Sequence, residues 1–234
     1  MKGLQWVLSA LAGITMLIIL LISSFEIGAY SDFDWYEKTY AKYNVLGDLE
    51  MEMSDAMQVT KEMMSYLRGN RADLVVEINV DGEEREFFND REKTHMVDVK
   101  NLFAGGLWIR RAAILVLALA IVLLIKTKAD WKRLLPKSFL ITIGSFLGIT
   151  LVAGVLFMTD FHRYFMIFHE IFFTNDLWLL DPDTDLLIRM LPEGFFLDMV
   201  KRIGLIFMIL MVIVLVISVM ILKRRNIRKT NKSI

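Results

Sequence analysis

The sequence contains no cysteine and only three prolines among 234 residues. Without a thiol, the chain has no disulfide, no thiolate metal ligand, no cysteine nucleophile and no cysteine that could itself be lipidated. A glycine-rich phosphate loop, a G-x-S-x-G elbow and a dinucleotide fingerprint are also missing from the sequence. These absences disfavour nucleotide-driven and serine-hydrolase chemistry, and no nucleic-acid-binding module is recognisable.

Apolar residues, in contrast, are abundant and make up 56% of the chain. Four apolar runs are long enough to cross a membrane, because an α-helix rises about 1.5 Å per residue and roughly 20 residues span the hydrocarbon core. The sequence therefore predicts an α-helical integral membrane protein with four transmembrane helices. Its polar part is predicted to be a mostly helical extracytoplasmic domain that contains a small β-hairpin.

The four apolar runs divide the chain into eight segments. The first run is longer than the apolar core of a secretory signal and lacks a clear cleavage site, so we interpret it as a retained signal anchor. The expected order is transmembrane helix 1 (1–25), an extracytoplasmic loop domain (26–107), transmembrane helix 2 (108–125), a cytoplasmic loop (126–138), transmembrane helix 3 (139–158), an extracytoplasmic loop with interfacial helices (159–202), transmembrane helix 4 (203–222) and a basic cytoplasmic tail (223–234).

Charge is distributed unevenly, although the formal net charge is zero. Residues 126–137 contain five Lys or Arg and one acid, and residues 223–234 contain six and none. Residues 26–107 contain eighteen acids and nine bases, and residues 159–199 contain eight and two. Because basic loops stay in the cytoplasm, both termini are expected there, and the two acidic loops are expected at the outer face of a cell membrane.

Local patterns predict the structure of the first loop. Residues 53–69 have the composition of a helix with several methionines. Two extended runs flank Asp81-Gly82, which is a strong signal for a two-stranded hairpin. Asn89 or Asp90 then starts a further helix that leads into transmembrane helix 2.

The three histidines are the main candidates for chemistry. His95 has Asp98 three residues later, on the same face of the predicted helix. In the second loop, phenylalanines at helical spacing predict an interfacial helix that carries His162 and His169, about 10 Å apart along its axis. We expect the two loops to meet and to combine His95 with His169. Histidine suits proton transfer near neutral pH, whereas inert loop histidines are the alternative interpretation.

Two metal-binding motifs are present only in part. His169 is followed by a glutamate, as in a zincin helix, but the position of the second ligand holds Phe173. Aspartates alternate over residues 181–185, as in a calcium loop, but the glycine position of that loop holds Leu186. Helix capping explains these aspartates better. No metal and no cofactor are therefore expected.

Several longer motifs carry a family resemblance. HMVDVK in the first loop, FHEIFFTNDLW and LDPDTDLLIRMLPEGFF in the second, and the earlier VTKEMMSYLRG resemble the lipoprotein intramolecular transacylases, integral membrane proteins of Gram-positive bacteria. The resemblance extends over essentially the whole chain, including the order of the four spans. His162 is not part of the family pattern.

The resemblance implies an acyltransferase. Its substrate would be a diacylated lipoprotein, whose N-terminal diacylglyceryl-cysteine would pass its sn-2 acyl chain to the α-amino group of the same cysteine. The product would be an N-acyl lyso-form lipoprotein. The partners implied are this lipoprotein and membrane phospholipid, and the oligomeric state stays open.

Roles for individual residues follow as hypotheses. His95, oriented by Asp98, would deprotonate the amine, while His169 would stabilise the oxyanion or protonate the departing oxygen, and the two histidine roles could be exchanged. Residues that would support the site or bind substrate are Tyr66, Arg68, Asn175 and Trp178. The alternative function is a non-enzymatic membrane adaptor whose acidic extracytoplasmic domain binds a partner protein.

Overall fold

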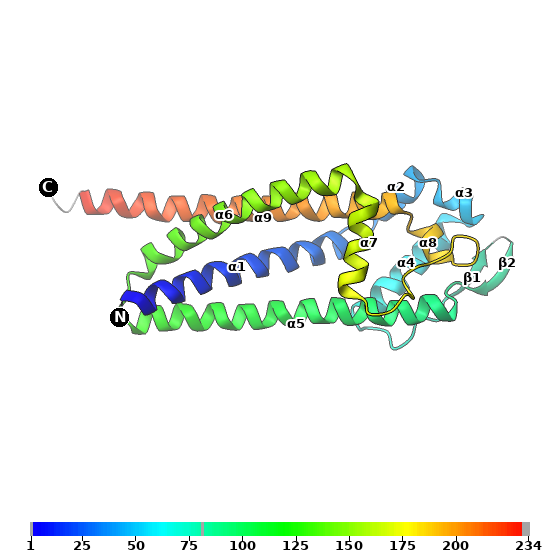
Figure 1. Cartoon of the computed structure of the whole chain (residues 1–234), viewed down its shortest axis with the longest axis horizontal. Helices are drawn as coiled ribbons and strands as arrows, with labels where there is room; N and C mark the ends of the chain where they lie inside the picture. The colour runs from blue at the N-terminus through cyan, green and yellow to red at the C-terminus, as the bar shows by residue number, and fades with distance from the viewer. Residues whose placement is uncertain (1, 81, 231–234) are drawn as a thin grey trace. The chain divides into compact units, whose positions relative to one another are not determined.

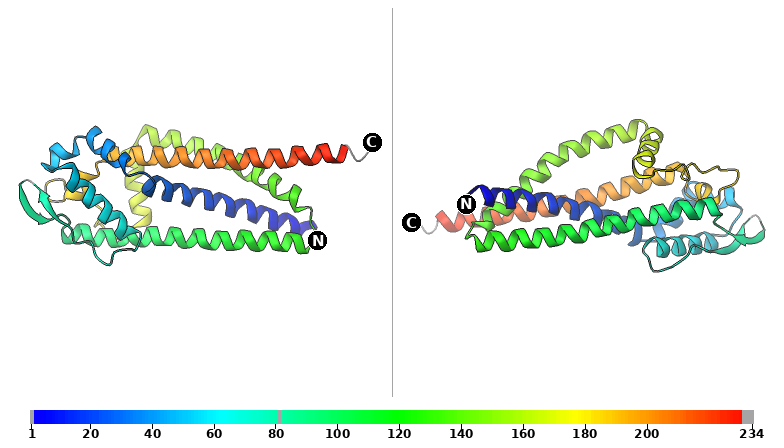
Figure 2. Two further views of the ribbon diagram at one scale, coloured as in Figure 1. Left: turned by 180° about the vertical axis from the view of Figure 1, so that it is seen from behind. Right: turned by 60° about the horizontal axis from the view of Figure 1, so that its bottom comes forward.

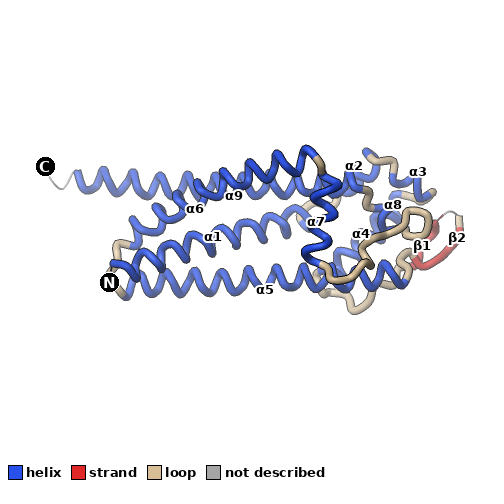
Figure 3. Tube along the Cα trace, viewed as in Figure 1, coloured by secondary structure: helices blue, strands red, loops and turns tan. Residues whose placement is uncertain are grey.

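A computed structural model describes residues 2–80 and 82–230, which form two compact units (Figure 1). Unit 1 comprises Met1–Ile27, Leu107–Thr159 and Ile203–Ile234, and unit 2 comprises Gly28–Gly106 and Asp160–Arg202. Helices dominate, with one small hairpin (Figure 3). The elements are α1 (Lys2–Tyr30), α2 (Asp34–Lys42), α3 (Val45–Leu49), α4 (Met53–Leu67), β1 (Glu77–Val80), β2 (Glu83–Glu86), α5 (Asp90–Lys126), α6 (Trp131–Thr159), α7 (Phe161–Phe172), α8 (Leu186–Met190) and α9 (Glu193–Thr230).

The four-span prediction is confirmed. Helices α1, α5, α6 and α9 each contain a segment long and apolar enough to cross a membrane. Most of the surface of these segments stays exposed in the folded chain, and large apolar side chains such as Leu115 and Val155 point outward. Exposed apolar surface of this extent suits a lipid environment.

Helix α1 contacts the other three long helices within unit 1, and the views in Figure 2 show it running along them. Near its start it packs against α5 and α6, and further along it packs against α6 and α9. A Cβ atom added at Gly13 would touch the side chains of Thr142 and Ser138. Glycine at this position therefore permits the close approach of α1 and α6. The buried residues of the two clusters are Leu8, Ala12, Ala120, Leu124 and Leu135, and Leu20, Ile143, Phe207 and Met211.

Unit 2 contains the hairpin and the shorter helices. The predicted methionine-rich helix is α4, and Gly69 follows it with φ of +82°, a conformation that glycine adopts readily. Strands β1 and β2 are antiparallel, with Glu77 opposite Glu86. Gly82 of the predicted turn has φ of +79°, whereas Asp81 lies outside the described residues. The predicted hairpin is thus confirmed.

The core of unit 2 is rich in aromatic side chains. Tyr40, Phe87 and Phe88 are almost completely buried, together with Met190 of α8. The Tyr40 hydroxyl lies 2.7 Å from that of Thr60, so this buried polar group has a partner. The predicted helix that starts at Asn89 or Asp90 is the beginning of α5, whose residues up to Gly106 belong to unit 2.

Candidate active site

Two histidines from different loops lie side by side in unit 2. His95 lies on the N-terminal part of α5, and His169 lies in the last turn of α7. Their ring centroids are 6.3 Å apart, and only 7% of His95 and 8% of His169 is exposed. The fold therefore brings two imidazoles from distant parts of the sequence together in one buried environment.

Aromatic rings enclose the two imidazoles. Trp178 stacks on His169 with ring centroids 4.9 Å apart, and Phe165 covers it at 4.3 Å. Phe173 contacts both histidines, at 5.2 Å from His95 and 5.5 Å from His169. Burial disfavours the charged form of an imidazole; it lowers the pKa of His95 to about 4, with a further contribution from neighbouring His169. Burial also lowers the pKa of His169, so both rings are neutral near pH 7.

A backbone hydrogen bond assigns the tautomer of His169. Its Nδ1 lies 2.7 Å from the carbonyl oxygen of Phe165. A carbonyl oxygen only accepts, so Nδ1 carries the proton and Nε2 of the neutral ring keeps its lone pair. His95 differs, because its Nδ1 is buried and has no hydrogen-bond partner among the described residues. The pair therefore offers one imidazole with a fixed tautomer and one whose buried Nδ1 has no partner among the described residues.

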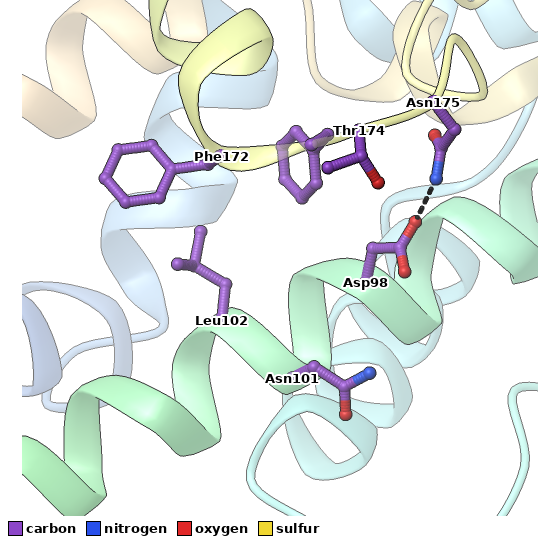
Figure 4. A pocket seen from close by; sticks show the side chains of 7 residues that line it. Asp98, Asn101, Leu102, Phe172, Thr174 and Asn175 are labelled. Carbon is purple, nitrogen blue, oxygen red and sulfur yellow. Dashed lines mark hydrogen bonds between the residues drawn. The ribbon is translucent and has the colours of Figure 1, made fainter.

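The Asp98 carboxylate contacts the second loop. It accepts a hydrogen bond of 2.8 Å from Asn175 (Figure 4), and no hydrogen bond joins it to His95. The spacing of three residues correctly places both side chains on neighbouring parts of α5, but the carboxylate turns toward the second loop. Its charge raises the pKa of His95, by less than burial lowers it. Asp98 therefore holds the loop through Asn175, and the orientation of His95 by Asp98 stays a prediction.

Asn175 connects Asp98 to the ring that covers His169. Its backbone carbonyl accepts a 2.8 Å hydrogen bond from the Trp178 indole, and its side-chain oxygen accepts one of 3.1 Å from the Leu177 amide. These bonds fix the turn in which Trp178 stacks on His169. A continuous series of contacts thus runs from Asp98 through Asn175 and Trp178 to His169.

A cavity of about 200 Å³ opens beside the histidines. Its walls come from α5 and from the end of α7 with the residues that follow (Figure 4). Phe173 belongs both to this wall and to the ring cluster around the histidines. The cavity thus has both apolar and polar walls, and Phe173 separates it from the imidazoles. Its lining residues are Asp98, Asn101, Leu102, Phe172, Phe173, Thr174 and Asn175.

Tyr66, Arg68 and His162 contact residues outside the histidine pair. Lys100 lies over the ring of Tyr66 at 3.9 Å, and Arg68 lies over the ring of Tyr30 at 4.5 Å. His162 is exposed, and its Nδ1 lies 3.0 Å from the carboxylate of Glu193. The structure thus groups Asn175 and Trp178 with the histidine pair, whereas Tyr66, Arg68 and His162 make other contacts.

Sequence reasoning missed a buried carboxylate at the start of α5. Glu92 is completely buried, and its two carboxylate oxygens accept hydrogen bonds from the backbone amides of Leu187, at 2.6 Å, and Asn89, at 2.8 Å. The Asn89 side chain in turn donates to Asp185 at 2.7 Å. Burial raises the pKa of Glu92, against the lowering effect of both amides. The sequence signal was the Asn-x-x-Glu spacing of a capping box.

Neighbouring Arg91 binds the loop that follows α7 to α5. Its guanidinium donates to the backbone carbonyls of Asp176, at 2.7 Å, and Leu179, at 3.1 Å. Together with the bonds made by Glu92 and Asp98, these contacts attach the loop after α7 and the start of α8 along about two turns of α5. The loop that carries Trp178 is consequently ordered against the helix that carries His95.

Comparisons of the sequence and of the fold with known proteins point to the same family. The sequence matches the model of the family described as lipoprotein intramolecular transacylase Lit over residues 10–196. No curated protein matches the chain. The fold is similar to three solved structures of the membrane-integral lipoprotein intramolecular transacylase Lit from Bacillus cereus.

The structural similarity extends over nearly the full length of both chains. The first structure has 18% sequence identity and a TM-score of 0.78 and covers 97% of this chain and 100% of its own. A variant with one histidine replaced by alanine has 19% identity and a TM-score of 0.76, with 97% of each chain covered. A variant with a histidine replaced by arginine has 17% identity and a TM-score of 0.75, with 97% and 96% covered.

Proposed function

Because the chain belongs to the lipoprotein intramolecular transacylase family, we propose that it moves the sn-2 acyl chain of a diacylglyceryl-cysteine lipoprotein to the α-amino group of that cysteine. The product is the N-acyl lyso-form lipoprotein. The family match supports an enzyme, and nothing in it supports the alternative of a non-enzymatic adaptor.

The proposed reaction is the aminolysis of an ester within one molecule. The amine nitrogen attacks the ester carbonyl and loses a proton, the bond to the glyceryl oxygen breaks, and that oxygen takes up a proton. The amine has a pKa near 8, so a base and a stabilised oxyanion accelerate the step. Substrate and product have the same mass. Because amine and ester belong to one molecule, holding them in the attacking geometry supplies much of the rate gain.

His169 is the better candidate for the base. Its Nδ1 proton is donated to the Phe165 carbonyl, which leaves the Nε2 lone pair to accept the proton of the amine. A hydrogen bond to the Nδ1 proton also favours the imidazolium that forms. The sequence first suggested His95 as the base and His169 as the residue that stabilises the oxyanion. The assignment proposed here exchanges these two roles.

His95 is the better candidate for oxyanion stabilisation. Burial holds its pKa at about 4, so it is a weak base and remains a neutral imidazole with one N–H to donate. Its Nδ1 has no partner among the described residues, so a substrate group could take that place. A preorganised donor in a dry site stabilises developing negative charge more strongly than water does. The proton that His169 takes up would finally pass to the glyceryl oxygen.

The remaining residues would position the reacting groups. Asp98 and Asn175 hold the turn that places Trp178 on His169, so their effect on the rate is indirect. The cavity beside Phe173 is proposed to accept the diacylglyceryl-cysteine, with Leu102 and Phe172 beside its acyl chains. Tyr66 and Arg68 stay proposed as outlying contacts for the substrate. The single observation that carries the assignment is the pair of buried imidazoles 6.3 Å apart.

A crossover experiment tests the proposal. Two diacylated lipopeptides, one with deuterated and one with ordinary acyl chains and with different peptide masses, are mixed and incubated with the purified protein. Tandem mass spectrometry then locates the acyl chain, because the reaction leaves the intact mass unchanged. We expect amine-acylated products in which each peptide keeps its own label. Mixed labels would overturn the intramolecular transfer, and unreacted amines would overturn the function.

The membrane orientation is also a proposal. The excess of acids in the loops of unit 2 and the basic residues at 126–137 and 223–234 support cytoplasmic termini and an active site at the outer leaflet. The absence of cysteine allows clean single-cysteine labelling. In intact cells, a membrane-impermeant maleimide should modify Glu84→Cys, whereas Lys223→Cys should react only after lysis. The opposite pattern would reverse the orientation.

A further inference from the structure

Unit 1 contains a cavity of about 260 Å³ between the beginning of α6 and the last turns of α9. Arg133 and Lys137 of α6 line one side, four residues apart and hence on one face. Leu222, Arg225 and Asn226 of α9 line the other. The volume is roughly nine times that of a water molecule in the liquid, which is room for a phosphate with a small polar substituent.

The charges around this cavity are not balanced. Asp130 forms an ion pair with Arg225 through both of its carboxylate oxygens. Arg133 and Lys137 have no acidic partner among the described residues, and Asp130 is the only acid within 126–137 and 223–234. The cavity wall therefore keeps two uncompensated positive charges, whereas the ion pair fixes the third cation in place.

The cavity lies at the edge of the apolar part of both helices. Lys137 precedes the apolar run 139–158 by two residues, and Leu222 ends the run 203–222. At about 1.5 Å per residue, both are within one helical turn of the hydrocarbon boundary. This is the depth of lipid phosphates, and Leu222 provides an apolar wall on the membrane side of the cations.

From this combination we propose that the cavity binds the phosphate headgroup of an anionic phospholipid. Arg133 and Lys137 contact the phosphate, and Arg225, held by Asp130, completes the positive wall. Basic pockets between transmembrane helices bind anionic headgroups in this manner, and the planar guanidinium of arginine matches phosphate geometry. The apolar surfaces of α6 and α9 then lie along the acyl chains, which is an anchorage that free phosphate lacks. The inference does not depend on the proposed acyl transfer.

The test compares lipids retained by the full-length protein. The protein is purified in phosphatidylcholine nanodiscs and exposed to phosphatidylglycerol with the same acyl chains, and bound lipid is counted by native mass spectrometry. We expect about a thirtyfold preference for phosphatidylglycerol, since each of the two cations contributes on the order of 1 kcal/mol. In the double variant Arg133→Gln/Lys137→Gln this preference should disappear.

A matched variant controls for general attraction to basic residues. Lys223→Gln/Arg224→Gln removes the same number of positive charges from α9, beside the lining residues Leu222 and Arg225 but at positions that do not line the cavity. It should keep the preference. Equal loss in both double variants would indicate diffuse attraction and overturn the site, as would full retention in Arg133→Gln/Lys137→Gln.

Thermal unfolding separates lipid from free phosphate and detects misfolding. Phosphatidylglycerol should raise the unfolding temperature of the wild type and of the control variant, whereas inorganic phosphate at the same phosphorus concentration should not. Equal stabilisation by inorganic phosphate would overturn the lipid assignment. If Arg133→Gln/Lys137→Gln unfolds in phosphatidylcholine alone, the single variant Lys137→Gln replaces it, with a partial loss of preference expected and an unchanged preference contradicting the proposal.

Discussion

The two units bury different kinds of polar side chain. In the described part of unit 1, the buried polar side chains are all serine or threonine hydroxyls, such as Ser9 and Thr15, which donate to carbonyls of the preceding turn of their own helix. Besides threonine and tyrosine hydroxyls, unit 2 buries two carboxylates and two imidazoles. The carboxylates are Glu92 and Asp185, and the imidazoles are His95 and His169.

The difference singles out unit 2 as the place of the proposed chemistry. A hydroxyl bonded to its own helix costs little to bury and can be placed almost anywhere along an apolar helix. A buried ionisable group is costly unless its surroundings satisfy it or neutralise it. Unit 2 accommodates its carboxylates with hydrogen bonds and its imidazoles by keeping them neutral. Changes in these groups should therefore have larger effects than changes in unit 1.

The largest effect is expected from His169. Replacing it by alanine removes the proposed base, so the rate of amine acylation per folded protein should fall by about 10²- to 10⁴-fold. Loss of His95 should cost about 10²-fold, as for an oxyanion donor. His162→Ala is the matched control, because this histidine is exposed and pairs with Glu193; its rate should stay within about twofold of wild type. Equal losses in all three variants would contradict the assignment.

Glu92 should dominate the stability of unit 2. Glu92→Ala leaves the amides of Asn89 and Leu187 without their acceptor, and unpaired buried groups of this kind should cost about 2 to 4 kcal/mol in total. Denaturant unfolding in mixed micelles measures the loss. Asp90→Ala, at the neighbouring exposed position, should cost less than about 1 kcal/mol. Similar losses in the two variants would show that the buried bonds do not stabilise the unit.

Acid should destabilise unit 2 more than unit 1. The folded-state pKa of His95 is about 4, below its usual 6.5, and that of His169 is lowered too. The unfolded chain therefore binds more protons as the pH falls below about 6.5, and from about pH 7 to pH 5 His95 alone should cost roughly 2 kcal/mol. Glu92 acts in the opposite sense, because its raised pKa favours the folded state on acidification.

The variant His95→Gln isolates this histidine effect. It should unfold with a shallower dependence on pH than the wild type when midpoints are measured between about pH 7 and pH 5. An unchanged slope would mean that burial does not depress the pKa of His95. The buried hydroxyls of unit 1 do not titrate in this range, so a probe on α1 should report little change.

The smallest effect is expected from the helix packing of unit 1. At Gly13, an added methyl group would meet the side chains of Thr142 and Ser138, and Gly13→Ala should cost about 1 to 2 kcal/mol, because these side chains can move only partly aside. At Gly144 an added Cβ has no neighbour within 4 Å. Gly144→Ala should be neutral or stabilise by up to about 1 kcal/mol. Equal effects on the thermal midpoint would show that α1 and α6 do not pack closely at Gly13.

The sequence predicted best the elements that follow from the length of apolar runs and from turn motifs. The four spans follow from the length of apolar runs, and the hairpin follows from Asp81-Gly82 between two extended runs. The proximity of His95 and His169 was also expected, from two loops that should meet over the bilayer. The spans and the hairpin needed only local patterns, whereas the meeting of the two histidines also needed the membrane topology, which puts both loops on one side.

Long-range partners were not accessible in the same way. The spacing of His95 and Asp98 determines a shared helix face, but the partner of Asp98 lies 77 residues away in Asn175. Likewise, the capping box at Glu92 predicts a bond to Asn89, whereas its second bond to Leu187 depends on the packing of α8. Burial of the site, and with it the pKa of His95, is a property of the tertiary structure alone.

The central claim is that His169 is a neutral base with its proton fixed on Nδ1. Solid-state NMR of ¹⁵N-histidine-labelled protein in lipid tests it directly, with the three resonance pairs assigned through His95→Gln and His162→Ala. At about pH 7 we expect His169 to be neutral, with Nδ1 protonated and Nε2 unprotonated, since its hydrogen bond goes to the Phe165 carbonyl. An imidazolium, or a ring protonated on Nε2 only, would contradict the account.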